Sequence, residues 1–206
     1  SVFRDELVNL FPHNEDAQKL AKNTFMLSEL LTKQAKDYDP PRLHMKAVLH
    51  GHCHHKSVLG FDGEQELLKK MGLEVQVVDS GCCGMAGSFG FEAGEKYEVS
   101  MKAGERKLLP EVRKASERAL IVSDGFSCRE QIEMGTKRRA LHTAQVLQMA
   151  MREGSAGSAG PLPETAYAPS NQERAEASGV RKWQVGMAAA VMAGAAGAVA
   201  LKASRR

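Results

Sequence analysis

Four cysteines are the residues of this chain best suited to chemistry, and they fall in three short motifs. Cys53 lies in HGHCHH, Cys82 and Cys83 are neighbours in DSGCCGMAGSFGFE, and Cys128 lies in SDGFSCREQI. Four thiolates can bind either an iron–sulfur cluster or a zinc ion. The paired C-x-x-C spacing that is typical of structural zinc is absent from the chain, which favours the cluster.

Glycines are concentrated around the two neighbouring cysteines. Gly81 comes directly before the pair and Gly84 directly after it. An iron–sulfur cluster is wider than a side chain, so the backbone must approach it closely, and glycine tolerates the dihedral angles that such an approach needs. Backbone N–H groups in this loop would also stabilise thiolate charge. We therefore expect Gly81 and Gly84 to contact the bound group.

Histidines surround Cys53, at positions 50, 52, 54 and 55. An imidazole ring can complete a metal site made of cysteines, or it can donate a hydrogen bond to a cluster sulfur. We assign such a role to His52. We expect His54 and His55 to lie in a surface loop, because exposed histidines without a specific role are common.

Three short apolar segments predict β-strands, at residues 45–50, 74–79 and 119–124. Residues 63–72, between the first two, have a helical pattern that ends at a glycine placed for a left-handed cap. A strand, a helix and a strand within about thirty residues form a βαβ unit, which implies parallel pairing and a right-handed crossover. Further helices are expected at 95–109, 111–118, 127–134 and 140–151. This alternation predicts an α/β fold, a small parallel sheet with flanking helices.

Each cysteine motif begins where one of these strands ends. The carboxyl ends of parallel strands lie at one edge of a sheet, where ligands usually bind. The three motifs should therefore bring four sulfurs to one place. Burial of the cysteines as small apolar residues is a weaker interpretation, because packing alone rarely repeats such a placement three times. Thiol chemistry at Cys82 and Cys83, reducing a disulfide substrate, is a third interpretation, but the chain lacks a C-x-x-C redox pair.

Two helical patterns precede the predicted domain, which spans residues 45–151. Residues 1–11 have helical spacing of apolar side chains. Asn14 can cap a second helix, whose apolar stripe includes Leu27 and Leu31. We interpret residues 1–44 as a helical segment that packs on the domain.

The composition changes after the predicted domain. Residues 152–182 are small, polar and proline-rich, which is typical of a flexible, disordered linker. Residues 183–206 form an Ala- and Gly-rich helix candidate with an uncharged run and basic flanks. Its apolar run is at the short end of what crosses a bilayer, so a membrane contact through 183–201 competes with an ordinary Ala-rich helix.

The overall composition excludes some classes of function. The net charge of +3 is mild and aromatic residues make up only 5% of the chain, so we expect no nucleic-acid partner. Four cysteines in 206 residues do not form a disulfide-dense scaffold. They indicate a reducing compartment, hence a cytoplasmic location, with any membrane association at the inner face.

The three cysteine motifs resemble those of the cysteine-rich CCG domain. This domain occurs in the B subunit of heterodisulfide reductase, in iron–sulfur subunits of glycolate oxidase and anaerobic glycerol-3-phosphate dehydrogenase, and at the C-terminus of FAD-linked D-lactate-dehydrogenase-like oxidases. GCCGMAGSFGFE and GFSCREQI are most similar to the last group, and the resemblance covers about residues 45–150. Such proteins usually carry two copies of the domain. Residues 1–44 resemble the end of a preceding copy.

The resemblance implies a [4Fe-4S] cluster held by Cys53, Cys82, Cys83 and Cys128. It also implies an oxidoreductase acting on a 2-hydroxy acid such as D-lactate or glycolate, with electrons passing from FAD towards a quinone or another carrier. No flavin-binding motif is visible, so FAD is expected on another domain or subunit. The chain departs from the family pattern at Gly125, where a cysteine would complete C-x-x-C with Cys128. A four-thiolate cluster, or one that also uses His52, is therefore expected.

Overall fold

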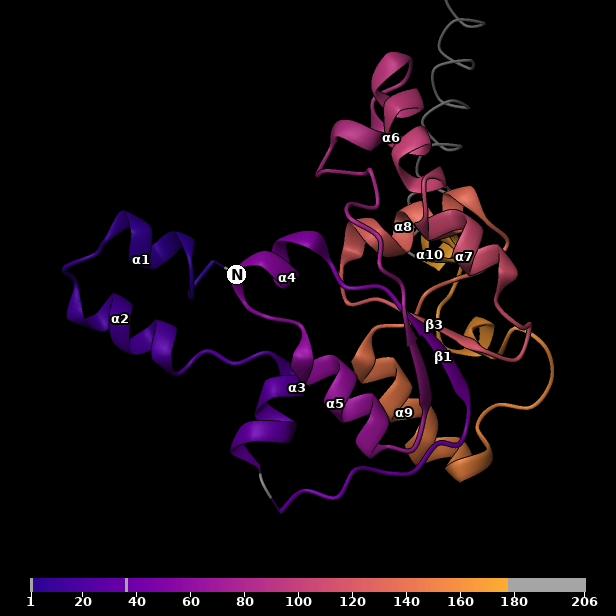
Figure 1. The fold of residues 1–206 in the computed structure, drawn as a ribbon, viewed down its shortest axis with the longest axis horizontal. Helices are drawn as coiled ribbons and strands as arrows, with labels where there is room; N and C mark the ends of the chain where they lie inside the picture. Colours follow the sequence, from indigo (N-terminus) through magenta and orange to yellow (C-terminus); the bar gives the residue numbers. More distant parts are fainter. Residues whose placement is uncertain (1, 36, 178–206) are drawn as a thin grey trace, which may run out of the picture. The chain divides into compact units, whose positions relative to one another are not determined.

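The computed structural model describes residues 2–35 and 37–177 (Figure 1). The described residues divide into two units, one that ends at Ala168 and one that begins at Pro169. The first unit contains the sheet and the cysteines. In the described part of the second unit, residues 171–177 form helix α10 (Asn171–Ala177). The predicted Ala-rich helix at 183–206 lies outside the described residues.

Three parallel strands form the sheet, in the order β2-β1-β3: β1 is Lys46–Leu49, β2 is Glu74–Val77 and β3 is Leu120–Val122. Ala47 of the central strand pairs with Val75 on one side and with Leu120 on the other. The strands β1 and β3 are almost fully buried, whereas β2 is an edge strand with exposed side chains. Each strand lies within a predicted segment, and the predicted α/β class with a small parallel sheet is confirmed.

Helices cover both faces of the sheet, because successive side chains of a strand point to opposite faces. On one face, Leu49 packs in a core with α5 (Asp62–Lys70) and α9 (Thr143–Glu153). On the other face, Val48 packs in a second core with α7 (Leu108–Lys114) and α8 (Phe126–Gly135). Figure 1 shows these helix pairs around the strands. The result is a three-layer arrangement.

The other described elements are short, apart from α6. They are α1 (Glu6–Leu10), α2 (Glu15–Lys22), α3 (Leu27–Glu29), the π-helical turn η1 (Leu30–Gln34), α4 (Cys53–Val58), η2 (Phe89–Phe91), α6 (Glu95–Glu105), η3 (Gly154–Ala156) and η4 (Pro163–Ala166). Helix α5 joins β1 to β2 as predicted, and Gly72 follows it with a φ of +95°. Helix α4 was not predicted from the sequence.

The second predicted helix is interrupted in the structure. Asn14 caps α2 as expected, since its Oδ1 accepts a hydrogen bond from Ala17 N at 2.9 Å. The helix then ends at Lys22, and the stripe residues Leu27 and Leu31 belong to α3 and η1 instead. The cause is local: the Asn23 amide and the Thr24 hydroxyl both donate to carbonyls of the last turn, which satisfies groups that a longer helix would use.

The structure also differs from the predicted linker, over residues 154–168. This segment packs on the sheet domain, and Glu164 is fully buried there. Its carboxylate accepts a hydrogen bond from Arg138 Nε at 2.5 Å, and Leu162 N donates to Glu117 O at 2.8 Å. A small, proline-rich composition predicts flexibility only when no partner holds the chain. Here a buried arginine provides that partner.

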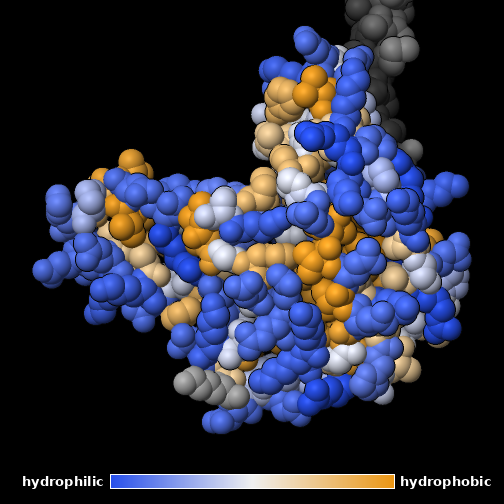
Figure 2. Space-filling view, viewed as in Figure 1, coloured by the Kyte–Doolittle hydropathy of each residue, from blue (hydrophilic) through white to orange (hydrophobic). Residues whose placement is uncertain are grey.

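Apolar side chains remain exposed on the α1–α2 segment. Phe3, Leu10 and Phe11 are each more than half exposed. Figure 2 shows orange, hydrophobic surface on the part of the molecule at the left, where Figure 1 draws α1 and α2. Among the described residues, no helix has the length and apolar character that a bilayer span requires.

Candidate metal centre

The three cysteine motifs all lie at the carboxyl edge of the sheet. β1 ends at Leu49, and Cys53 then begins α4. β2 ends at Val77 and leads into the loop with Cys82 and Cys83, while β3 ends at Val122, just before α8 with Cys128 in its first turn. Because the strands are parallel and adjacent, these three loops are neighbours. The sequence-based prediction of a common edge agrees with this arrangement.

The four sulfurs form a graded series from surface to core. Cys82 is exposed and Cys53 half-buried, whereas Cys83 and Cys128 are buried. Interactions run from Cys53 to Cys82, from Cys82 to Cys83, and from Cys83 to Cys128. Among the described residues, no three cysteine sulfurs lie within 4.8 Å of one another. The thiols are therefore neighbours whose spacing is wider than that of a compact tetrahedron.

One of the four thiols readily forms a thiolate. The Cys128 thiol acts as a hydrogen-bond donor to Cys83 and lowers the pKa of Cys83 to about 6, with help from the backbone N–H of Met85. The same interaction, together with burial, raises the pKa of Cys128. Burial raises the pKa of Cys82, and the hydrogen bond from Gly84 N to Cys82 Sγ, at 3.3 Å, partly offsets this. Cys83 is thus the group that carries negative charge near neutral pH.

Gly125 lies between the His52 ring and the Cys128 sulfur. A Cβ atom built on Gly125 would lie 2.8 Å from His52 Cδ2 and 3.0 Å from Cys128 Sγ. Real side chains do not tolerate contacts this short, so the lack of a side chain at position 125 leaves room for the ring and the sulfur. The structure therefore brings the predicted His52 next to one of the predicted cysteines. Burial lowers the pKa of His52, with a further contribution from His54, so the ring is favoured in its neutral form.

The two glycines predicted to contact a bound group have different surroundings. Gly84 has a φ of +100°, and a Cβ there would lie 2.1 Å from the carbonyl oxygen of Ser100 in α6. Position 84 therefore needs glycine for the fold itself. Gly81 is exposed, and a Cβ there would meet nothing within 4 Å. The fold makes no steric demand for glycine at position 81.

One histidine lies elsewhere than expected. His55 is not a surface residue, because it is only 6% exposed and its Nε2 lies 3.4 Å from Glu64 Oε1. Burial lowers the pKa of His55 and raises that of Glu64 to about 7. The prediction failed because α4 turns His55 inward onto α5, and the sequence gives no strong signal for a helix of six residues.

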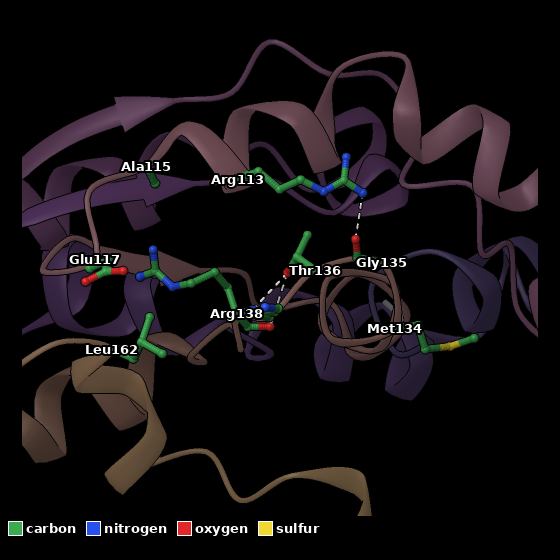
Figure 3. A pocket seen from close by; sticks show the side chains of 9 residues that line it. Arg113, Ala115, Glu117, Met134, Gly135, Thr136, Arg138 and Leu162 are labelled. Atoms are coloured by element: carbon green, nitrogen blue, oxygen red, sulfur yellow. Dashed lines mark hydrogen bonds between the residues drawn. The ribbon is translucent and has the colours of Figure 1, made fainter.

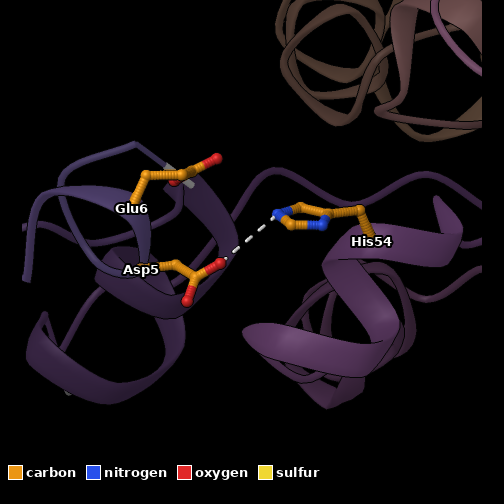
Figure 4. Close-up of side chains that lie close together, drawn as sticks. All are labelled: Asp5, Glu6 and His54. Atoms are coloured by element: carbon orange, nitrogen blue, oxygen red, sulfur yellow. Dashed lines mark ion pairs between the residues drawn. The ribbon is translucent and has the colours of Figure 1, made fainter. Parts of the chain in front are cut away.

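His54 faces the amino-terminal helix instead (Figure 4). Its Nε2 lies 4.0 Å from Asp5 Oδ2, and Glu6 adds a carboxylate, so that the three potential ligand atoms lie within 4.8 Å of one another. None of the three residues is buried. This contact links α1 to α4, beside Cys53.

A pocket of about 550 Å³ lies near the amino end of β3, away from the carboxyl ends of the strands (Figure 3). It is lined by Arg113, Met134, Lys137 and Leu162, among others. Its walls include the residues that lead into the amino end of β3, whereas the cysteines follow the carboxyl ends. The sequence did not predict this pocket, which is separate from the cysteine site.

The chain is similar to known dehydrogenases. It is 38% identical over 112 residues to a subunit of the anaerobic glycerol-3-phosphate dehydrogenase of Escherichia coli (strain K12), a match that covers 53% of this chain and 27% of that protein. It is 29% identical over 154 residues to D-2-hydroxyglutarate dehydrogenase of Pseudomonas putida, covering 73% of this chain and 14% of the relative. The enzyme of the same name from Pantoea ananatis is 31% identical over 101 residues, which are 48% of this chain and 10% of the relative.

These similarities confirm part of what the motifs predicted. A likeness to anaerobic glycerol-3-phosphate dehydrogenase was expected, and it is found. No family model matches the chain, and no solved structure gives a significant match. The chain spans about a quarter of the length of the first relative and less of the others.

Proposed function

We propose that this chain is the iron–sulfur electron-transfer part of a flavin-linked dehydrogenase. The observation that carries the proposal is the convergence of Cys53, the Cys82–Cys83 pair and Cys128 at one sheet edge. The relatives support the general class, since each is named as a dehydrogenase or as part of one. The organic substrate would be oxidised outside this chain, and a 2-hydroxy acid such as D-lactate or glycolate is the class that the motif resemblance implies.

The residues at this edge fit a [4Fe-4S] cluster. Four thiols supply the donor set, Cys83 is already disposed to ionise, and the missing side chain at Gly125 leaves space beside Cys128. The four thiolates would hold the iron, and His52 would contact the group as a further ligand or as a hydrogen-bond donor. When bound, the cluster accepts and passes on one electron at a time. The backbone N–H of Gly84 would stabilise the thiolate of Cys82, on the exposed side.

The spacing of the sulfurs supports a cluster over a single zinc ion. Four thiolates at about 2.3 Å from one zinc lie roughly 3.8 Å from one another. No three of the described cysteine sulfurs come within 4.8 Å of one another, so their spacing is wider than in that arrangement. A wider group with several iron atoms suits this spacing better.

Thiol–disulfide chemistry is the second alternative. The low pKa of Cys83 would suit an attacking thiolate, but this cysteine is only 2% exposed. The exposed Cys82 has a raised pKa instead. The cysteine that a substrate can reach is therefore not the one that ionises readily. This is unfavourable for attack on a disulfide substrate.

The proposed partners follow from the same function. A flavin-containing domain or subunit would deliver electrons, and a quinone or another carrier would receive them. Residues 183–201 are proposed as the contact with the inner face of the membrane, with the domain on the cytoplasmic side. No nucleic-acid partner is proposed, as the mild charge indicated.

Iron and sulfide content tests the proposal directly. The full chain, purified without oxygen, should be brown and should contain about four iron atoms and four sulfides per chain. The variant Cys83→Ser should lose most of the iron, because it removes the preferred thiolate. The variant Ala159→Ser, in the exposed part of the 154–168 segment, is the matched control and should keep the iron. A colourless protein with stoichiometric zinc, or equal iron in both variants, would refute the ligand assignment.

A further inference from the structure

Each of the three strands is followed by a buried polar side chain before the cysteines are reached. His50 follows β1 and is 1% exposed, Ser80 comes after β2 and is 4% exposed, and Ser123 follows β3 and is fully buried. Hydrogen bonds tie the backbone here, since His50 N donates to Val122 O at 2.9 Å. Between the strand ends and the cysteines, the sheet edge therefore carries three buried polar side chains. We call His50, Ser80 and Ser123 the polar layer.

Two atoms of this layer lack a hydrogen-bond partner. His50 Nδ1 lies 2.8 Å from Ser80 Oγ, but His50 Nε2 is buried and has no partner. Ser123 Oγ is likewise buried without one. When Ser80 donates to Nδ1, the proton of the neutral ring is on Nε2, which makes Nε2 a donor.

An unpartnered buried donor costs free energy, so its retention calls for an acceptor. Ser123 identifies the side on which that acceptor lies. Its hydroxyl is close enough to the Cys128 sulfur to interact with it, although the two groups make no hydrogen bond of normal geometry. The hydroxyl is therefore already close to a sulfur. His50, through Ser80, is linked to the loop that carries Cys82.

We propose that His50 and Ser123 are the hydrogen-bond donors that the fold reserves for the sulfur atoms of the group held by the cysteines. Their Nε2–H and Oγ–H would bond to thiolate or sulfide sulfur. Such bonds stabilise the more negatively charged, reduced form, and they raise the reduction potential of an iron–sulfur cluster. Both residues would contact the bound group directly, and this inference rests on the proposed function.

The reduction potential of the reconstituted full chain tests this inference. The variants are His50→Phe, which keeps a ring without donors, and Ser123→Ala. Each should shift the potential to a more negative value, with iron and sulfide content unchanged. Pulsed electron paramagnetic resonance of ¹⁵N-histidine-labelled protein should detect a nitrogen coupling to the reduced cluster that is lost in His50→Phe, whereas any coupling from His52 should remain. The matched control is His13→Phe, because His13 is an exposed histidine of the amino-terminal segment.

The outcomes separate this inference from the proposed function. A wild type that binds no iron and sulfide defeats the proposed function. A cluster that forms normally, with the same potential in the wild type, His50→Phe and Ser123→Ala, defeats the inference alone. If His50→Phe does not fold, Ser80→Ala replaces it. That variant keeps the ring but removes the hydroxyl that sets its proton, and it should also shift the potential downward, whereas an unchanged value would count against His50 as a donor.

Discussion

Gly84 and Gly81 flank the same cysteine pair, but only one of them is required by the backbone. Gly84 has a φ of +100° and closely approaches the Ser100 carbonyl, whereas a side chain at Gly81 would extend into open space. The loop therefore uses glycine for two separate reasons. One is to place the cysteine pair against α6, and the other, still a prediction, is to leave room for the bound group.

These two positions give a matched pair of substitutions in the metal-free protein. Gly84→Ala should destabilise the fold by at least roughly 1–3 kcal/mol, the cost of an unfavourable backbone conformation, with the 2.1 Å contact to Ser100 O adding to this. Gly81→Ala should leave the free energy of unfolding nearly unchanged. Urea denaturation followed by circular dichroism measures both. Equal losses of stability in the two variants would contradict the steric account.

At the scale of elements, a buried ion pair and several backbone hydrogen bonds hold the segment of residues 154–168 on the domain. Arg138 lies between α8 and α9, and its guanidinium reaches Glu164 of η4 as well as the carbonyl oxygens of Ser116 and Ala119. Both charged side chains are at least nine-tenths buried. Removing one partner of such a pair leaves an uncompensated buried charge.

The variant Glu164→Gln should therefore lose about 3–5 kcal/mol of stability, as expected for a broken buried ion pair. It should also make residues 154–168 accessible to proteases under native conditions, because the pair anchors this segment. Thermal unfolding and limited proteolysis would measure the two effects. Glu66→Gln, at an exposed position of α5, serves as the control. Protease resistance equal to that of the wild type would show that the other contacts suffice to hold the segment.

At the scale of the whole molecule, buried ionisable groups behind the cysteine edge make stability depend on pH. Glu64 is 2% exposed, and burial raises its pKa to about 7, with Asp124 and Glu29 contributing. His55 is the basic residue it faces, and burial lowers the pKa of that ring, which disfavours a compensating positive charge. Because the folded state binds the Glu64 proton more tightly than the unfolded state, the stabilisation is fully present below the unfolded pKa. It is lost as pH rises towards about 7.

The metal-free wild type should therefore lose stability relative to Glu64→Gln between about pH 4.5 and pH 7. A shift of this size corresponds to a difference of about 3 kcal/mol across the window, since one pKa unit is worth about 1.4 kcal/mol. Urea denaturation at pH 5 and pH 8 measures the difference. A gap between the two proteins that does not change with pH would mean that Glu64 does not titrate in this range.

Much of the cysteine site was predictable, because its parts depend on local patterns. The segment around Val48 is apolar over a strand's length, and residues 63–72 have a helical pattern that ends at a glycine. A βαβ unit has one common handedness, so the positions of three strands were enough to predict a shared edge for Cys53, Cys83 and Cys128. The glycine-rich surroundings of the cysteine pair predicted a bound group that the backbone approaches closely.

The remaining features depended on contacts between residues distant in sequence, which a local pattern does not contain. The ring of His52 is beside Cys128 only because β1 and β3 are adjacent, and Arg138 anchors a segment whose composition predicted flexibility. The composition, the strands and the cysteine motifs were determined by the sequence itself, since hydrophobic periodicity and turn chemistry are local properties. Which histidines are buried, and where Glu164 binds, was decided by tertiary packing, because the burial of a polar group depends on a partner from another part of the chain.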